Sequence, residues 1–147
     1  MLGDRLLDGK TTGLGEWEAS MNDTHRAIDM IPKNIMICDW HYERADVTSA
    51  YFATKGFFVA TCPWRNPDIA AVQLKNMVDF RQQSTSEMRV RFHGMIQTVW
   101  SGADGFLNTY YNPETYNLPP NATREQQNQG GDARTLKRMM EEFKKFN

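Results

Sequence analysis

Apolar runs and amphipathic segments alternate along the chain. Three short apolar runs bounded by Pro or Gly are typical of strands that are buried on both faces. They cover residues 35–38, 57–62 and 94–100. Four further segments have apolar residues at the spacing of a helix. They run from Asn22 or Asp23 to Met30, from Asp46 to Gly56, from Asn66 to about Gln83, and over residues 103–111.

Two predicted helices are expected to bury a well-defined apolar face. In the helix that opens at Asn66 and Pro67, this face consists of Ile69, Val72, Leu74, Met77, Val78 and Phe80. A last helix, capped by Asp132, has on one side Leu136, Met139, Met140 and Phe143. Residues 112–131, between the last two helices, are rich in Pro, Asn, Gln and Gly, so we expect a surface linker there.

The order of these elements predicts an α/β fold. Parallel strands alternate with helices and are joined by right-handed crossovers. Such a sheet is either a small open sheet or part of a (β/α)8 TIM barrel. A complete barrel takes about 250 residues, so a chain of 147 residues supplies about half of one. We expect residues 1–111 to form the partial barrel, followed by the linker at 112–131 and the helix at 132–147.

Composition excludes several classes of function. The chain has 17 Lys and Arg against 18 Asp and Glu, which gives no electrostatic reason to bind nucleic acid or an anionic membrane. No apolar run is long enough to cross a membrane. We expect no cofactor and no metal, since the sequence has no phosphate-binding glycine loop and no metal-ligand spacing. Cys38 and Cys62 are expected to be buried free thiols, although a bridge between neighbouring strands stays open.

All four Trp residues fall at predicted strand ends, where parallel α/β proteins bind ligands. Aromatic faces pack against the C–H faces of sugar rings, while carboxylates and Arg bind the hydroxyls, so we predict a carbohydrate site. Its residues are Trp17, Glu18, Asp39, Trp40, Tyr42, Glu43, Trp64, Arg65 and Trp100. The alternative, in which the Trp rings only plug the end of the sheet, stays open. His41 is expected to be a satisfied surface histidine.

The strand ends also resemble those of a known enzyme family. The matching pieces are Trp17-Glu18, Ile37-Cys-Asp-Trp40, Lys55-Gly-Phe-Phe-Val-Ala-Thr-Cys-Pro63 and Gly94-Met-Ile-Gln-Thr-Val-Trp-Ser101. Over residues 13–105 they resemble the C-terminal half of the catalytic barrel of family 20 glycoside hydrolases, the β-N-acetylhexosaminidases. The resemblance implies that Trp17, Trp40 and Trp100 wall the sugar pocket, with Trp100 as its floor.

The resemblance also implies that the bond-cleaving residues lie elsewhere. The family uses the acetamide of the sugar as nucleophile, with an adjacent Asp-Glu pair on an earlier strand, and no Asp-Glu dipeptide occurs in this chain. We therefore expect a glycosidase fragment without catalytic residues, in which Met1 is not the true start. Its partner would be the missing N-terminal half or a second copy, because a half barrel has unpaired edges and is prone to aggregate. Glycosidases of this type are often exported, but no export signal is visible in the sequence, so the localisation stays open.

The chain departs from the family at two positions, so the sugar it prefers stays open. Pro63-Trp64-Arg65 stands where the family has a Tyr that binds the acetamide, and Gly102 stands where it often has a hydroxyl-binding Glu. Two alternatives remain: a non-catalytic carbohydrate-binding α/β domain and a plain structural domain. A carboxylate pair about 5–9 Å apart among Glu18, Asp39 and Glu43 would favour catalysis within the chain.

Overall fold

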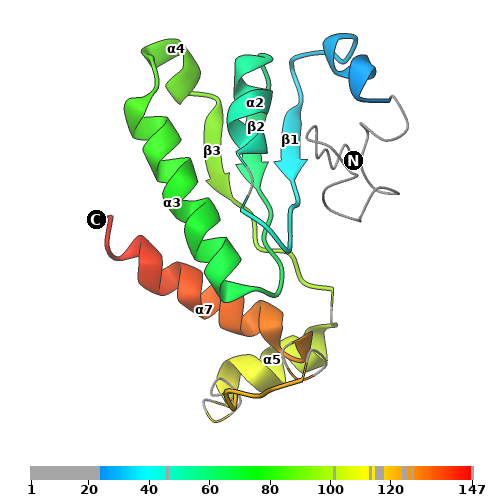
Figure 1. The fold of residues 1–147 in the computed structure, drawn as a ribbon, viewed down its shortest axis with the longest axis vertical. Helices are drawn as coiled ribbons and strands as arrows, with labels where there is room; N and C mark the ends of the chain where they lie inside the picture. The colour runs from blue at the N-terminus through cyan, green and yellow to red at the C-terminus, as the bar shows by residue number, and fades with distance from the viewer. Residues whose placement is uncertain are drawn as a thin grey trace.

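The computed structural model describes residues 24–45, 47–100, 102–112, 114, 118–123, 126 and 128–146. Within them, three strands form one parallel sheet in the order β1-β2-β3, with helices between the strands (Figure 1). The elements are the 3-10 helix η2 (Thr24–Asp29), β1 (Met36–Asp39), α2 (Thr48–Thr54), β2 (Phe58–Thr61), α3 (Pro67–Gln83), α4 (Ser86–Arg89), β3 (Phe92–Met95), α5 (Ala103–Tyr111) and α7 (Gly131–Phe143). The predicted α/β class with parallel strands is confirmed.

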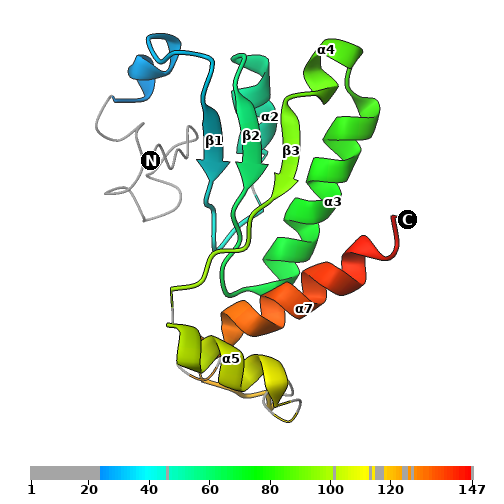
Figure 2. The same cartoon turned by 180° about the vertical axis from the view of Figure 1, so that it is seen from behind.

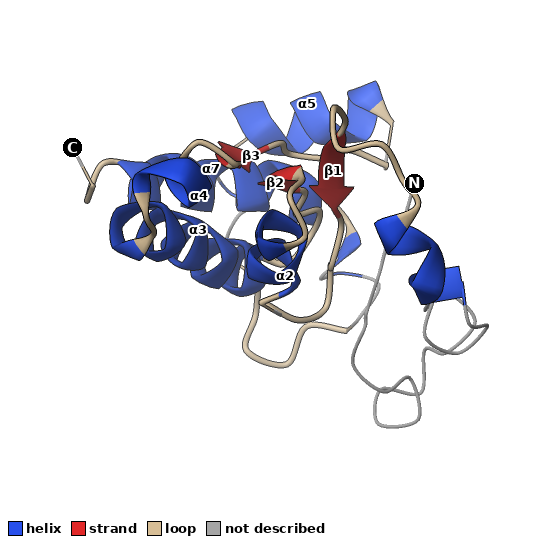
Figure 3. Ribbon diagram, turned by 90° about the horizontal axis from the view of Figure 1, so that it is seen from above, coloured by secondary structure: helices blue, strands red, loops and turns tan. Residues whose placement is uncertain are grey.

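Both crossover helices cover the same face of the sheet. Helix α2 packs against β1 and β2, and α3 packs against β2 and β3. Figure 2 shows the strands in front of these helices, and Figure 3 shows α2 and α3 together on one side of the sheet. The core lies between the two layers and includes Ile28, Ile37, Phe52, Ala53, Phe57, Val59, Met77 and Phe92. Among the described residues, no helix covers the opposite face.

The expectation that the run at 35–38 is buried on both faces is wrong. Exposure alternates along β1: Ile37 and Asp39 are buried, whereas Met36 and Cys38 are exposed. The cause is the one-sided cover of the sheet, since successive side chains of a strand point to opposite faces. Cys38 is therefore exposed, contrary to expectation, while Cys62 is buried as expected.

The third strand begins two residues earlier than expected and ends at Met95 instead of continuing to Trp100. Its pairing with β2 is irregular, because Val59 pairs with Phe92 but Thr61 pairs with Met95, which leaves one extra residue in β3. Gly94 allows this bulge, since its φ of 95° lies in the left-handed region that favours glycine.

Helices α2 and α3 end and begin as predicted. After α2, the Gly56 amide donates to the Ala53 carbonyl (3.0 Å) and the Phe57 amide to the Phe52 carbonyl (3.1 Å), and Gly56 has a φ of 94°. This is a Schellman motif. At the start of α3, the Asn66 side chain accepts hydrogen bonds from two backbone amides. The predicted caps Asn22, Asp23 and Asp46 lie outside the described residues.

The buried face of α3 differs from the expected one. It consists of Ala70, Gln73, Leu74 and Met77. Leu74 and Met77 were expected, whereas Val72 is 48% exposed and Ile69, Val78 and Phe80 are only partly buried. Compared with the prediction, α3 is rotated about its axis, so that the face it buries includes the polar residue Gln73. None of the described helices is both long and apolar enough to span a membrane.

Helix α7 begins at Gly131, so Asp132 lies in its first turn and is not its cap. The helix packs across α3 and α5. Two glycines allow this close approach: a Cβ on Gly130 would collide with the Thr109 hydroxyl, and one on Gly131 would lie 2.6 Å from the Arg65 carbonyl oxygen. Of the four expected apolar contacts only Met139 is fully buried; Leu136 is partly buried, and the two others, Met140 and Phe143, are exposed.

Candidate functional site

The chain segments that leave the three strands stay side by side beyond the sheet. The Cys62 amide donates to the Asp39 carbonyl at 2.7 Å, which joins the first two segments. The Ile96 amide donates to the Thr61 carbonyl at 2.9 Å, which joins the third segment to the second. These bonds gather the carboxyl ends of all three strands at one edge, the edge at which parallel α/β proteins bind ligands.

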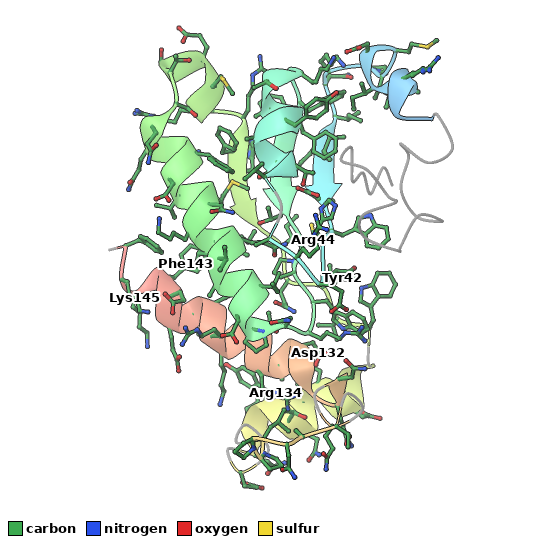
Figure 4. The ribbon with its side chains drawn as sticks, viewed as in Figure 1. Tyr42, Arg44, Asp132, Arg134, Phe143 and Lys145 are labelled. Atoms are coloured by element: carbon green, nitrogen blue, oxygen red, sulfur yellow. The ribbon has the colours of Figure 1, made fainter. Side chains whose placement is uncertain are left out.

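Four aromatic side chains meet at this edge, and we call them the aromatic cluster: Trp40, Tyr42, Trp64 and Trp100. Tyr42 is at its centre. The Tyr42 ring centroid lies 5.4 Å from that of Trp40 and 5.3 Å from that of Trp64, in tilted and edge-on geometries that aromatic pairs prefer. The Trp100 Nε1 donates to the Tyr42 hydroxyl at 2.8 Å, and the Trp100 side chain is 61% exposed. Figure 4 shows Tyr42 beyond the ends of the strands.

Hydrogen bonds from the third segment to the backbone carbonyls of Pro63 and Trp64 fix the position of Trp64. The Gln97 Nε2 donates to the Trp64 carbonyl at 2.7 Å, and the Thr98 amide and hydroxyl both donate to the Pro63 carbonyl, at 2.9 and 2.8 Å. Sequence reasoning missed Gln97 and Thr98 as supporting residues. Their signal was present, because they are two adjacent polar residues inside an apolar run.

A charged pair borders the aromatic cluster. The Arg65 guanidinium lies 4.1 Å from the centre of the Trp64 ring, and its Nη2 donates to Glu43 Oε1 at 2.8 Å. The Arg65 side chain is 18% exposed and that of Glu43 is 43% exposed. The stacking and the ion pair hold Arg65 in one orientation, although a pair this exposed contributes little to stability. Charged donors and acceptors therefore lie at the border of an aromatic surface.

Asp39 lies beneath this surface, in a buried polar cluster that consists of Asp39, His41, Thr48 and Gln73. Its Oδ1 is 2.6 Å from His41 Nδ1, and its Oδ2 accepts from the Thr48 hydroxyl at 2.7 Å. Gln73 Nε2 donates to the His41 carbonyl at 2.7 Å. All four residues are 5% exposed or less. Asp39 was expected to bind substrate, but its carboxylate is occupied by these partners.

The other three members of the polar cluster were not identified as site residues from the sequence. His41 was expected at the surface, yet it is buried against Asp39. Thr48 stands in the first turn of α2, which returns to the end of β1. Gln73 gave no signal in the sequence, because the predicted buried face of α3 differs from the observed one, which contains Gln73.

Several buried polar atoms near the strand ends have no hydrogen-bond partner within the described part of the chain. They are Trp40 Nε1, Thr61 Oγ1, Gln73 Oε1 and Gln97 Oε1. Most buried polar atoms in folded proteins are paired with protein or with ordered water. Trp40 belongs to the aromatic cluster and Gln97 donates to the Trp64 carbonyl, so a buried donor and a buried acceptor at the cluster have no partner among the described residues.

The structure brings together six of the nine predicted site residues: Trp40, Tyr42, Glu43, Trp64, Arg65 and Trp100. Asp39 is adjacent but buried, and Trp17 and Glu18 lie outside the described residues. Within the described ranges, no group of three or more His, Cys, Asp or Glu side chains is arranged to hold a metal ion. The arrangement is suited to binding a ligand that has both apolar faces and hydroxyl groups.

Comparison with protein-family models gives no match for this chain, and comparison with curated proteins gives none either. Function is therefore argued from the geometry of the site.

Proposed function

We propose that the chain is part of a (β/α)8 glycosidase barrel and supplies the aromatic wall that binds an N-acetylhexosaminide or a related sugar. The exposed Trp100 in the aromatic cluster is the observation that supports this most directly. It is 61% exposed although it is ordered by a hydrogen bond to Tyr42. Covering its exposed part with the C–H face of a sugar removes on the order of 100 Å² from water, worth about 2.5 kcal/mol.

The polar groups around the cluster suit the hydroxyls of a sugar. Glu43 and Arg65 offer a carboxylate acceptor and guanidinium donors next to the Trp64 ring. Hydrogen bonds to charged groups are stronger than neutral ones, and two groups of opposite sign can orient a ring that has several hydroxyls. Binding sites of this kind combine aromatic area with a few fixed polar groups.

The strand order favours a barrel and not a doubly wound sheet as the parent fold. The spatial order of the strands follows their order in the chain, and α2 and α3 cover one face. A doubly wound sheet reverses its strand order and carries helices on both faces. In a barrel the uncovered face becomes the interior, which accounts for the apolar Met36 and Phe58 there, 43% and 36% exposed.

The free edge of β3 also suits a further β/α unit. A cavity of about 490 Å³ runs beside this edge, between α3 and the end of α7, and its lining is mostly apolar. The lining includes Leu74, Met77, Val78, Phe92 and Phe143. In a barrel, the next strand and helix pack at this position, and parallel sheets are found with both faces and edges covered.

The partners of Asp39 in the polar cluster support a site in which the described residues bind a sugar but do not cleave its glycosidic bond. Asp39 is buried and engaged by His41 and Thr48, so it is unsuited to serve as the acid of a glycosidase. In the barrel proposal the acid comes from outside this chain. The alternative is a domain that binds carbohydrate and cleaves none, which the same aromatic cluster supports.

The proposal is tested by titrating the chain with N-acetylglucosamine and, separately, glucose while recording the indole N–H signals in ¹H–¹⁵N NMR spectra. We expect the Trp100 signal to shift with saturation, and Tyr42→Phe, which removes the hydroxyl that Trp100 binds, to weaken binding. Tyr111→Phe is the matched control, because Tyr111 is a 72% exposed aromatic residue on α5. Unchanged indole signals with both sugars would refute sugar binding by this cluster.

Hydrolysis tests the expectation, common to both versions of the proposal, that this chain does not cleave the glycosidic bond by itself. The chain alone is expected to release no nitrophenol from a nitrophenyl N-acetylglucosaminide. Hydrolysis by the isolated chain that survives in an Asp39→Asn variant would mean that a carboxylate other than Asp39 provides the acid.

A further inference from the structure

The two charges of the Arg65–Glu43 ion pair are not held equally firmly. The Arg65 guanidinium lies 4.1 Å from the centre of the Trp64 ring, and its side chain is 18% exposed. The Glu43 side chain is 43% exposed. Among the described residues, its carboxylate has a single hydrogen bond, the 2.8 Å bond that Oε1 accepts from Arg65 Nη2. The cation is therefore held by its surroundings, whereas the carboxylate is held by the cation alone.

The backbones of the two residues show the same difference. The Trp64 carbonyl accepts from Gln97 Nε2 at 2.7 Å, and α7 packs against the main chain of Arg65, since a Cβ on Gly131 would lie 2.6 Å from the Arg65 carbonyl oxygen. Glu43 stands in the loop between β1 and α2, outside any helix or strand. Arg65 thus presents its charge at one place beside the aromatic cluster, and the Glu43 side chain can turn into water by breaking one hydrogen bond.

The chemistry of the fixed cation selects for a carboxylate. A guanidinium has several N–H donors in a planar fork that matches a carboxylate, and hydrogen bonds to ionised groups are about twice as strong as neutral ones. A ligand carboxylate has the same chemistry as the Glu43 side chain, so it can replace Glu43 as the partner of Arg65. A ligand ammonium group has only Glu43 to bind, and it would have to lie beside a cation that cannot move away.

We propose that the aromatic cluster binds an acidic sugar, a hexuronic acid residue, whose carboxylate pairs with Arg65 at the place that Glu43 occupies in the structure. This inference rests on the proposed function, because it needs the cluster to bind a sugar, and it adds the class of sugar. Arg65 is then the residue that determines specificity: the sugar ring stacks on the aromatic cluster, and the carboxylate at its edge meets the guanidinium. Glu43 stands in for the acid group of the ligand and competes with it.

Three methyl glycosides that differ only at C6 test the inference: methyl β-glucuronide, methyl β-glucoside and the neutral amide of the glucuronide. Each is titrated into the full chain at neutral pH and low salt, while the indole N–H signals are followed by NMR. We expect the glucuronide to bind about fivefold more tightly than either neutral sugar, because a neutral hydrogen bond becomes charge-assisted. High salt should reduce this preference, since the ion pair is open to solvent.

Three variants assign the preference to the ion pair. Arg65→Gln should bind the glucuronide no more tightly than the glucoside. Glu43→Gln should bind the glucuronide more tightly than the wild type does, because the competing carboxylate is gone, and this exposed position gives a test that does not depend on the folding of the Arg65 variant. Arg138→Gln is the matched control, because Arg138 pairs with Glu142 at 3.1 Å on α7 and its loss should change no affinity. Circular dichroism checks that all three variants are folded.

The outcomes distinguish this inference from the sugar site itself. Equal affinities for the three glycosides would refute the acidic sugar and leave the sugar site in place. Tighter binding of methyl β-glucosaminide, whose amine is protonated, than of the glucuronide would show that Glu43 sets the charge preference, and this would overturn the inference. A preference for the glucuronide that persists in Arg65→Gln would overturn it too, because the anion would then bind elsewhere. Unchanged indole signals with all of these sugars would refute both proposals.

Discussion

Residues 39–42, at the end of β1 and just after it, have side chains on two different sides. Asp39 and His41 point to the helix-covered side and are buried with Thr48 and Gln73. Trp40 and Tyr42 belong to the aromatic cluster, which is at least partly exposed to solvent. The alternation of side chains along this segment thus separates a buried polar side from a partly exposed aromatic side, and we propose that the aromatic side binds the ligand.

The two clusters differ mainly in their exposure, since each contains one buried side-chain atom that has no partner among the described residues, Gln73 Oε1 and Trp40 Nε1. In the polar cluster, both Asp39 carboxylate oxygens and the His41 carbonyl have partners. In the aromatic cluster, Trp100 is 61% exposed and the buried Trp40 Nε1 has no partner among the described residues. Substitutions on the two sides should therefore separate stability from binding.

Asp39→Ala should have the largest effect on folding. It removes the charged acceptor of both His41 and Thr48 and leaves these two buried groups only the 3.3 Å contact between Thr48 Oγ1 and His41 Nδ1, which costs about 3 kcal/mol. Urea unfolding followed by circular dichroism measures this loss. Asp29→Ala is the control, because Asp29 pairs with Lys55 at the surface and its loss should change stability little. Similar unfolding midpoints for the two variants would mean that the polar cluster does not stabilise the fold.

Gly131→Ala should destabilise the protein by about 2 kcal/mol, because overpacking against a backbone forces the helix to move. The new methyl group would lie 2.6 Å from the Arg65 carbonyl oxygen, so α7 must shift away from the segment that carries Trp64 and Arg65. Gly105→Ala in α5 is the matched control, because a Cβ there meets nothing within 4 Å. This control should stabilise the protein by about 0.5 kcal/mol. A Gly131→Ala variant as stable as the wild type would show that the contact relaxes freely.

The sequence predicts the elements of this fold better than it predicts which side chains are buried. Gly56 marks the end of α2 and Asn66 marks the start of α3. Both do so through hydrogen bonds to residues nearby in the sequence, so their effect can be predicted from the local sequence alone. The exposure of Cys38 could not be predicted, because it depends on which face the helices cover. The bulge at Gly94 also depends on a neighbouring strand, with Val59 and Thr61 setting the register.

The aromatic cluster was predictable because topology brings strand ends together. Parallel strands place Trp40 and Trp64, which follow β1 and β2, at one edge, and the segment after β3 that bonds to its neighbour carries Trp100 to the same edge. The polar cluster was not predictable in the same way. The partners of Asp39 come from α2 and the residue after β1, and only the packed structure decides that a carboxylate at a strand end turns inward.

Thr48→Val should cost about 1 kcal/mol, because it keeps the shape of the side chain but removes one buried hydrogen bond to Asp39. The expected loss is smaller than for Asp39→Ala because Asp39 keeps its bond to His41. Thr54→Val is the control, since Thr54 is exposed at the end of α2 and bonds only a local carbonyl. Sugar binding should be unchanged in both variants. A loss of binding in Thr48→Val would mean that the two sides of the segment are coupled.

Trp100→Ala should have the smallest effect on stability and the largest effect on binding. The residue is 61% exposed, and its substitution removes one hydrogen bond to Tyr42, so the free energy of unfolding should fall by less than about 1 kcal/mol. The loss of its stacking surface should weaken sugar binding at least tenfold, which corresponds to about 1.4 kcal/mol. Trp100→Phe keeps a ring but loses the N–H donor, and it should retain part of the affinity. If Trp100→Ala instead destabilised the fold as much as Asp39→Ala and left binding unchanged, the Trp ring would be a structural plug, and the two sides of residues 39–42 would both serve the fold.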